Sequence, residues 1–299
     1  MKNSLLYKEL RALLEKKLEF LPDKPEETVD STLSALWLLS GGEKVSAEKA
    51  VNRELPELTD EQIGELKKLV DTRISGVPLA HITGRQQFLG VELISNNKAL
   101  IPRKETEILG RTALKFLEEL VATGREEVVA FDLCCGAGNL AVALASHVRQ
   151  VRLFASDLSS EAVELTKENI RFHHLEDRIT VLPGSIFEAF EGNGFDENVD
   201  MVICNPPYIS DTKVSKMASE ISEHEPDLAF KGGMLGLNVI TELMRKAPLF
   251  LKKDGLLLFE VGLGQGEFVQ QLCIKTSLYR EVGMVPDDQG NVRVITARK

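Results

Sequence analysis

The segment FDLCCGAGNLAVALA, residues 131–145, identifies the fold class of this chain most clearly. An apolar run ends at Asp132, a turn with Gly136 and Gly138 follows, and small apolar residues typical of a buried helix come next. Glycines in such a turn let the backbone approach a ligand closely at the carboxyl edge of a parallel sheet. A complete Gly-x-Gly-x-x-Gly dinucleotide signature is absent, because Cys134 stands where its first glycine is expected. The segment therefore predicts a strand, a tight turn and a helix, and it indicates a nucleotide site only weakly.

From residue 128 onward, strand and helix patterns alternate. Strand-like runs cover 128–133, 151–156, 179–182, 199–204 and 255–261, and helical stretches cover 139–147, 159–172 and 237–251. Apolar strands that alternate with helices are typical of a parallel sheet covered on both faces. The tail, residues 279–299, has two strand-like runs around Asp287, Asp288 and Gly290, which predict an antiparallel hairpin. We therefore expect a Rossmann-like α/β fold.

The chain before residue 83 has the periodicity of helices. Leucines recur at helical spacing from Leu6 to Leu21, and Thr59 with Gln62 matches a capping box. Residues 86–101 are rich in apolar and β-branched residues with turn signals, which favours a hairpin. The expected divisions are a helical domain at 1–82, a linking β-hairpin at 83–101 and an α/β domain at 102–299. The amphipathic helices are expected to pack around their own core, and their surface is available to a partner.

The amino-acid composition limits the classes of protein to which this chain can belong. The 299 residues are 43% hydrophobic and 27% charged, as in globular proteins, and no apolar run is long enough to predict a membrane span. Four cysteines form neither a disulfide framework nor the paired spacing of a zinc site, so we expect a cytoplasmic protein without a metal. A net charge of −10 argues against a surface that neutralises many phosphates, so direct DNA binding is not expected. Nothing in the sequence specifies an oligomeric state.

Asp157 strengthens the prediction of a nucleotide site. It ends the strand pattern that follows the 139–147 helix, where an acidic residue can accept both hydrogen bonds of a ribose diol. Capping of the next helix is the competing role, but Ser159 or Ser160 can fill it. The glycine turn and Asp157 together indicate an adenosine-containing cofactor. They leave a nicotinamide cofactor and S-adenosylmethionine both open.

The segment MVICNPPYIS, residues 201–210, favours methyl transfer. Its strand stops in a stiff turn at the same edge of the sheet as the glycine turn. An amide nitrogen is a poor nucleophile, so it must be oriented and its N–H groups must be polarised by acceptors. The Asn205 side-chain oxygen and the Pro206 carbonyl can supply two such acceptors, and Tyr208 offers an aromatic face.

These motifs resemble those of the bacterial release-factor glutamine methyltransferases, the HemK/PrmC-like group, over most of the chain. The matching segments are GVPLAHITGRQQFLGVELISNNKALIPRKETE, FDLCCGAGN, DLSSEAVELTKENI, ICNPPYIS, SEHEPDLAFKGGMLGLNVI, LLLFEVGLGQ and DDQGNVRVI. The resemblance implies a seven-stranded class I methyltransferase domain that uses S-adenosylmethionine. It also implies that the N-terminal helical domain docks a release factor and that the acceptor is a glutamine side chain.

The resemblance also implies site residues. Cys134 to Gly138 would line the methionine moiety, Asp157 the ribose and Ile186 the adenine. The full expected cofactor set is Asp132, Cys134, Cys135, Gly136, Ala137, Gly138, Asn139, Asp157, Leu158, Ser185, Ile186 and Asn205. The expected catalytic residues are Asn205, Pro206 and Tyr208, and the expected substrate contacts are Asn205, Pro206, Pro207, Tyr208, Arg103, Glu107 and Glu225.

Departures from the family pattern keep other substrates open. Lys104 stands where proline is usual, Ser185 and Leu235 each replace a usual aspartate, and Cys134 replaces a glycine. They suggest a paralogue with a different acceptor, such as the guanidino group of free arginine or a similar small amino acid. Carboxylates that suit a guanidinium are Glu105, Glu107, Glu223 and Glu225. More distant alternatives are an NAD-binding Rossmann protein, which leaves Asn-Pro-Pro-Tyr unexplained, and a non-catalytic binding protein that retains the fold.

Overall fold

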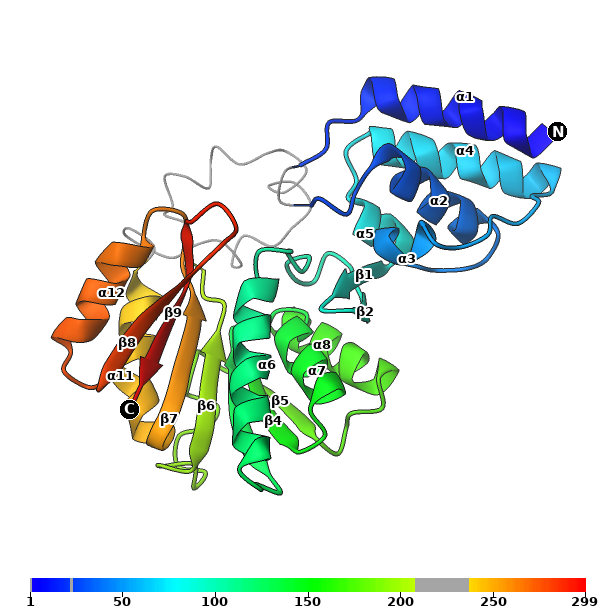
Figure 1. The fold of residues 1–299 in the computed structure, drawn as a ribbon. Coiled ribbons are helices and arrows are strands. Elements are labelled where there is room, and N and C mark those ends of the chain that lie inside the picture. Colours follow the sequence, from blue (N-terminus) through cyan, green and yellow to red (C-terminus); the bar gives the residue numbers. More distant parts are fainter. Residues whose placement is uncertain (1, 22–23, 208–236) are drawn as a thin grey trace.

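The computed structural model describes residues 2–21, 24–207 and 237–299 of the chain (Figure 1). Its helices are α1 (Lys2–Lys17), α2 (Val29–Ser40), α3 (Ala47–Ala50), α4 (Asp60–Ile74), α5 (Leu79–Thr83), α6 (Glu107–Ala122), α7 (Asn139–His147), α8 (Ser160–Phe172), α11 (Asn238–Phe250) and α12 (Gly266–Lys275). Its strands are β1 (Arg85–Phe88), β2 (Val91–Ile94), β3 (Val128–Leu133), β4 (Val151–Asp157), β5 (Ile179–Pro183), β6 (Val199–Cys204), β7 (Leu251–Glu260), β8 (Glu281–Pro286) and β9 (Val292–Arg298). Within these described ranges, no helix has the length and apolar character needed to cross a membrane.

Seven strands form one sheet in the order β5-β4-β3-β6-β7-β9-β8. The strands from β5 to β7 pair in parallel, whereas β9 runs antiparallel to both β7 and β8. This arrangement confirms the predicted α/β sheet and its terminal antiparallel hairpin. The chain moves from β3 outward to β5 and then returns to β6 on the other side of β3. The carboxyl ends of β3 and β6 therefore form a topological switch point, where open α/β sheets bind ligands.

Strand β7 begins earlier than the sequence predicts. It starts at Leu251 instead of residue 255, and Leu251 pairs with Val199 before the register shifts. Asp254 adopts a left-handed conformation, with φ of 68°, within this irregular part of the strand. The residues around Asp254 are polar and partly or fully exposed, so the apolar pattern did not include them.

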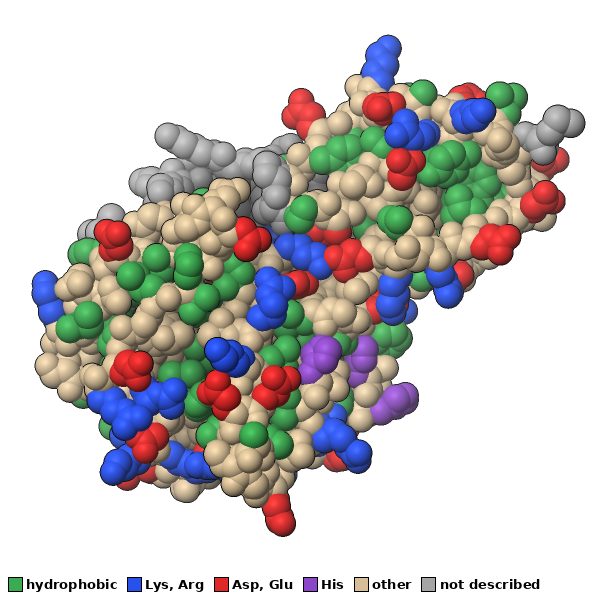
Figure 2. Space-filling view, viewed as in Figure 1, with side chains coloured by type: hydrophobic (Ala, Val, Ile, Leu, Met, Phe, Trp, Pro, Cys, Tyr) green, Lys and Arg blue, Asp and Glu red, His purple; other side chains and the backbone are tan. Residues whose placement is uncertain are grey.

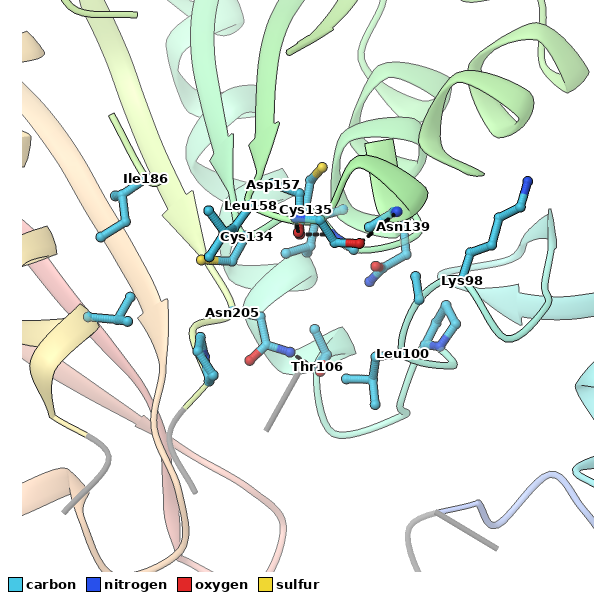
Figure 3. Close-up of a pocket in the computed structure, with 18 of the residues that line it drawn as sticks. Lys98, Leu100, Thr106, Cys134, Cys135, Asn139, Asp157, Leu158, Ile186 and Asn205 are labelled. Carbon is cyan, nitrogen blue, oxygen red and sulfur yellow. Dashed lines mark hydrogen bonds between the residues drawn. The ribbon is translucent and has the colours of Figure 1, made fainter. Parts of the chain in front are cut away.

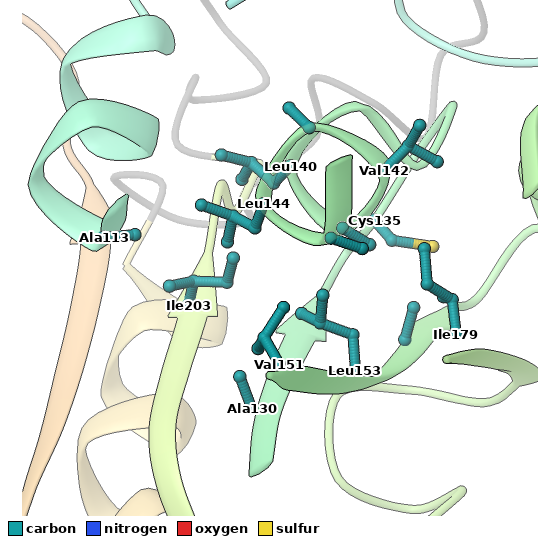
Figure 4. Packing of buried hydrophobic residues seen from close by; sticks show 14 of the residues in the cluster. Ala113, Ala130, Cys135, Leu140, Val142, Leu144, Val151, Leu153, Ile179 and Ile203 are labelled. Atoms are coloured by element: carbon teal, nitrogen blue, oxygen red, sulfur yellow. The ribbon is translucent and has the colours of Figure 1, made fainter. Parts of the chain in front are cut away.

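Different helices cover the two faces of the sheet (Figure 1). On one face, Leu140 and Leu144 of α7 belong to a buried cluster with Val151, Leu153 and Ile203 from the strands (Figure 4). Burial of one such side chain stabilises the fold by about 1.5–3 kcal/mol. The packing fixes α7, whose amino-terminal end lies at the switch point.

Aromatic residues pack on the other face. Phe131 of β3 lies 4.4 Å from Phe190 and 5.1 Å from Phe195 between ring centroids, and Phe187 stacks on Phe250 at 4.8 Å. Aromatic pairs at these separations stabilise beyond the area that they bury. Because Phe131 directly precedes Asp132, the cluster supports the strand end that carries the glycine turn.

Helices α1 to α5 pack around a core of their own, in which Trp37 is 2% exposed. The Thr59 and Gln62 capping box begins α4, as the sequence predicts. A second capping box, formed by Thr28 and Ser31, begins α2 and was not recognised, because serine replaces the usual acid or amide.

The hairpin of β1 and β2 connects the helices to the sheet. Leu89 and Gly90 form its two-residue turn, with φ of 49° and 79°. The Leu89 N–H donates to the Glu107 carboxylate at 3.0 Å, and the Leu89 carbonyl lies 2.8 Å from His147 Nε2. These contacts hold the tip of the hairpin on α6 and α7.

Ion pairs gather where the helical part meets the α/β part. Lys104 pairs with Glu48 of α3 and, at 2.9 Å, with Glu107 of α6, while Lys49 lies 3.3 Å from Glu92 of β2. Figure 2 shows basic and acidic side chains together at this junction. Lys104 thus joins the two parts directly.

Candidate active site

The turn between β3 and α7 forms one side of a pocket at the switch point. Gly136 and Gly138 are left-handed, with φ of 56° and 76°. A Cβ at Gly138 would lie 2.7 Å from Thr166 Cγ2, whereas a Cβ at Gly136 would meet nothing within 4 Å. Gly138 therefore permits close packing of the turn on α8, and Gly136 leaves open space in the pocket. Cys134, at the position of the missing glycine, is also left-handed at 57°, which costs about 1–2 kcal/mol.

Asp157 connects the end of β4 to this turn. Its Oδ2 accepts the Gly136 N–H at 2.8 Å, and its Oδ1 accepts the Ser159 N–H at 2.9 Å. Burial raises the pKa of the Asp157 carboxyl, although these backbone donors oppose the shift. A carboxylate has about four lone-pair sites, so each oxygen can still accept a hydroxyl from a ligand in the pocket.

Asp132 lies beneath the turn and does not line the pocket. It is 0% exposed, and its Oδ2 accepts the Ala141 N–H at 2.9 Å. Burial raises the pKa of the Asp132 carboxyl to about 7. The position of this side chain suits support of the first turn of α7 more directly than contact with a ligand.

Replacing Asp132 with asparagine should change how stability depends on pH. The native pKa of about 7 exceeds the ordinary 3.8, so the native state binds more protons than the unfolded state between these values. Stability therefore falls as pH rises through this window, by up to about 4 kcal/mol from this group. In Asp132→Asn this loss is absent. Thermal unfolding should be measured at pH 5 and pH 8. The unfolding temperature of the variant, relative to that of the parent, should be higher at pH 8 than at pH 5.

The matched control for this prediction is Asp196→Asn, which changes an exposed carboxylate in the loop before β6. Its unfolding temperature should follow that of the parent at both pH values. A constant difference between Asp132→Asn and the parent across pH would contradict the assigned titration.

The turn after β6 lies on the opposite side of the same pocket. Asn205 and Pro207 line the pocket, and Pro206 between them is buried. The Asn205 Nδ2 donates to Thr106 Oγ1 at 3.2 Å (Figure 3). Tyr208, the last residue of the Asn-Pro-Pro-Tyr motif, lies outside the described residues.

The pocket brings together most of the residues that the sequence selected. Those that line it are Arg103, Cys134, Cys135, Gly136, Asn139, Asp157, Leu158, Ser185, Ile186, Asn205 and Pro207. Asp132, Ala137, Gly138, Pro206 and Glu107 are not among its lining residues. Glu225, like Tyr208, lies outside the part of the chain that the structure describes.

Further residues that the sequence did not indicate as site residues also line the pocket. They are Lys98, Ala99, Leu100, Pro102, Thr106, Leu140, Ser159, Ala162 and Val239. The loop from Lys98 to Thr106 follows the hairpin and reaches the switch point, as Figure 3 shows for Leu100 and Thr106. Its segment IPRKETE is part of the sequence that resembles the methyltransferase family. This resemblance was the signal in the sequence that side chains of the loop lie near the site.

Two of the four glutamates that suit a guanidinium, Glu105 and Glu107, lie in the described part of the chain, and both are bound to basic residues. Glu105 lies 2.6 Å from Arg293 Nη2, and the Glu107 carboxylate binds Lys104 and Arg111, each at 2.9 Å. Neither glutamate lines the pocket. Glu223 and Glu225 lie outside the described residues. Among the carboxylates that the structure does describe, Asp157 is the one that lines the pocket.

The chemistry of the pocket fits an adenosine-containing ligand. Asp157 offers acceptors for a ribose diol, and the Gly136 backbone leaves room for close approach. Leu158 lines the pocket and is an apolar residue that is 64% exposed. Ile186 is a second apolar residue of the lining. Exposed apolar surface at a pocket suits a planar base.

Comparison with known proteins agrees with this arrangement. Residues 110–243 match the family model described as Methyltransferase small domain. The release factor glutamine methyltransferase of Thermodesulfovibrio yellowstonii is 31% identical over 82% of this chain and 85% of its own length. That of Geobacter sulfurreducens is 30% identical over 97% of this chain and 96% of its own.

Solved structures agree at the level of the fold. The hMettl16 catalytic domain, in a complex with the MAT2A 3′UTR hairpin 6, superposes with a TM-score of 0.55 at 13% identity, over 77% of this chain and 81% of that one. A human methyltransferase 10 domain containing protein gives 0.51 at 14% identity, over 77% and 96%. The sheet order, the pocket at its switch point and the full-length relatives together place this chain in the release factor glutamine methyltransferase family of class I methyltransferases.

Proposed function

We propose that this protein transfers a methyl group from S-adenosylmethionine to the side-chain amide nitrogen of a glutamine in a peptide chain release factor. The observation that carries the proposal is that Asn205 and Asp157 line one pocket. Asn205 can accept a hydrogen bond from a planar nitrogen, and Asp157 can accept hydrogen bonds from the hydroxyls of a ribose. The relatives named release factor glutamine methyltransferase support the glutamine acceptor.

The residues that would hold S-adenosylmethionine are Asp157 at the ribose, Leu158 and Ile186 at the base, and the Cys134–Gly138 turn at the methionine part. When bound, this cofactor supplies an electrophilic methyl group on a sulfonium. The left-handed Gly136 presents backbone instead of a side chain to the pocket, so the turn can approach a ligand closely.

Orientation of the acceptor nitrogen falls to the turn after β6. The Asn205 Oδ1 and the Pro206 carbonyl can each accept one N–H of a primary amide. When both N–H groups of the target amide are hydrogen-bonded in this way, the electron density on its nitrogen increases and the plane of the amide is fixed. Pro206 and Pro207 restrict the backbone, so little entropy is lost when the amide is held. The acceptor nitrogen gains one methyl group and releases one proton to solvent overall, so no strong base is needed before transfer.

A free-arginine acceptor has no specific support. A guanidinium at this site needs paired carboxylates, and Glu105 and Glu107 are bound to Arg293, Lys104 and Arg111 away from the pocket. We therefore treat arginine methylation as an outcome that the substrate assay must be able to detect.

Methyl transfer from tritiated S-adenosylmethionine should label purified release factor and leave free arginine unlabelled. Mass spectrometry of a digest should then place the methyl group on one glutamine. A release factor in which that glutamine is replaced by asparagine is the matched control, because it keeps an amide but shortens its reach. Label on free arginine alone, or on the control protein as strongly as on the parent, would contradict the proposed acceptor.

A further inference from the structure

The hydroxyl of Thr106 has an unusual use. Thr106 occupies the N-cap position of α6, where a threonine side chain usually accepts a hydrogen bond from a backbone N–H of the first turn. Here no such bond is made. Instead, Thr106 Oγ1 accepts the amide Nδ2–H of Asn205 at 3.2 Å, across 99 positions of sequence. The hydroxyl thus serves the pocket and not its own helix.

The position of this hydroxyl is fixed by the protein around it. Thr106 is 2% exposed, its N–H donates to the Arg103 carbonyl at 3.2 Å, and its own carbonyl accepts the Gly110 N–H at 3.1 Å. Leu109 in the next turn is fully buried in the core. A β-branched side chain also has few rotamers. Thr106 therefore presents its oxygen to Asn205 without needing to be ordered when a substrate arrives.

In the structure the contact holds one of two orientations of the Asn205 amide. The terminal torsion of asparagine is broad and roughly two-fold, so the side chain can present either its oxygen or its NH2 group in a given direction. When Nδ2 is held by Thr106, Oδ1 lies on the other side of the planar amide. A target nitrogen that carries N–H needs this oxygen as an acceptor. In the flipped orientation, Oδ1 would face the Thr106 hydroxyl, which can donate as well as accept, and the Asn205 NH2 group would meet the NH2 group of the target as a second donor.

From this geometry we infer that Thr106 is a positioning residue, which holds the Asn205 amide so that its oxygen serves the acceptor nitrogen. The inference rests on the proposed function, because it assigns Asn205 Oδ1 to the methyl acceptor.

Three variants test this assignment by kinetics. Thr106→Val keeps the shape of the side chain and removes the hydroxyl, whereas Thr106→Ser keeps the hydroxyl. Thr112→Val is the matched control, because the Thr112 hydroxyl bonds to the Ile108 carbonyl within the same helix and Thr112 does not line this pocket. We expect kcat on release factor to fall about tenfold or more in Thr106→Val, with a smaller change in KM. Thr106→Ser should recover most of the loss, and Thr112→Val should match the parent.

A second readout does not depend on activity. In protein labelled with ¹⁵N at asparagine, the side-chain NH2 signals of Asn205 are identified by their absence in Asn205→Ala. Their shift and their slow exchange with water should be lost in Thr106→Val and kept in Thr106→Ser. Unchanged Asn205 signals in Thr106→Val, or equal loss of rate in the valine and serine variants, would overturn the role of Thr106. If the amide signals respond as expected but the parent does not label release factor, the proposed substrate fails and the Thr106 contact stands.

Discussion

Asn205→Ala should lose most methyl transfer while its affinity for the cofactor stays within about threefold of the parent. The lost side chain supplies an acceptor to the target nitrogen, and preorganised contacts of this kind contribute about 100- to 1,000-fold to turnover. The hydrogen bonds of Asp157 to the glycine turn do not involve Asn205, so the cofactor side of the pocket should be preserved. Single-turnover methylation of release factor gives the rate, and calorimetry with S-adenosylhomocysteine gives the affinity.

Asn198→Ala is the matched control for this variant. Asn198 precedes the same strand at its other end, is exposed and bonds to the Gly194 carbonyl at 3.2 Å. It should retain the parental rate. If Asn205→Ala weakens cofactor binding as strongly as it slows transfer, the turn after β6 does not have the separate role assigned to it.

Asp157→Ala should instead weaken the cofactor first, by about 10- to 100-fold in dissociation constant. This range corresponds to the net loss of one charge-assisted hydrogen bond, which contributes about 1.5–3 kcal/mol. The same substitution removes the acceptors of the Gly136 and Ser159 N–H groups, so the turn that lines the pocket also loosens. At saturating cofactor, much of the parental turnover should return, which separates this variant from Asn205→Ala.

The parent protein should show a matching dependence on pH. Burial raises the pKa of Asp157, so its carboxylate protonates at a higher pH than an exposed aspartate does. A protonated carboxyl cannot accept both ribose hydroxyls and both backbone N–H groups, so cofactor affinity should fall as pH decreases toward this pKa. Asp196→Ala, an exposed change in the loop before β6, should leave the pH profile intact. A profile that is the same in Asp157→Ala and in the parent would rule out this titration as its cause.

Local patterns in the sequence predicted the sheet well. The helix expected at 139–147 is α7 with the same bounds, because the glycine turn and the change from strand to helix periodicity mark its beginning. The strands at 128–133 and 199–204 likewise have the expected limits. Strand β7 was predicted too short because the three residues after Leu251 are polar. Each of these outcomes follows from side chains that are near one another in sequence.

Contacts between distant segments were not predictable in the same way. The carboxylate of Glu107 binds the Leu89 turn and two basic side chains instead of lining the pocket. The sequence around Glu107 does not indicate these contacts. The approach of Thr106 to Asn205 likewise depends on how α6 packs against the sheet. Asp132 has the sequence context of a cofactor ligand, but its full burial beneath the turn follows from the packing of α7. These roles arise from tertiary structure, which a linear pattern does not encode.

A crystal structure with bound S-adenosylhomocysteine tests the account most directly. The ribose hydroxyls should lie within hydrogen-bonding distance of the Asp157 carboxylate, and the sulfur should face the Asn205 Oδ1 across a gap wide enough for a planar amide. A ribose bound away from Asp157, or a sulfur on the far side of the glycine turn from Asn205, would contradict the account.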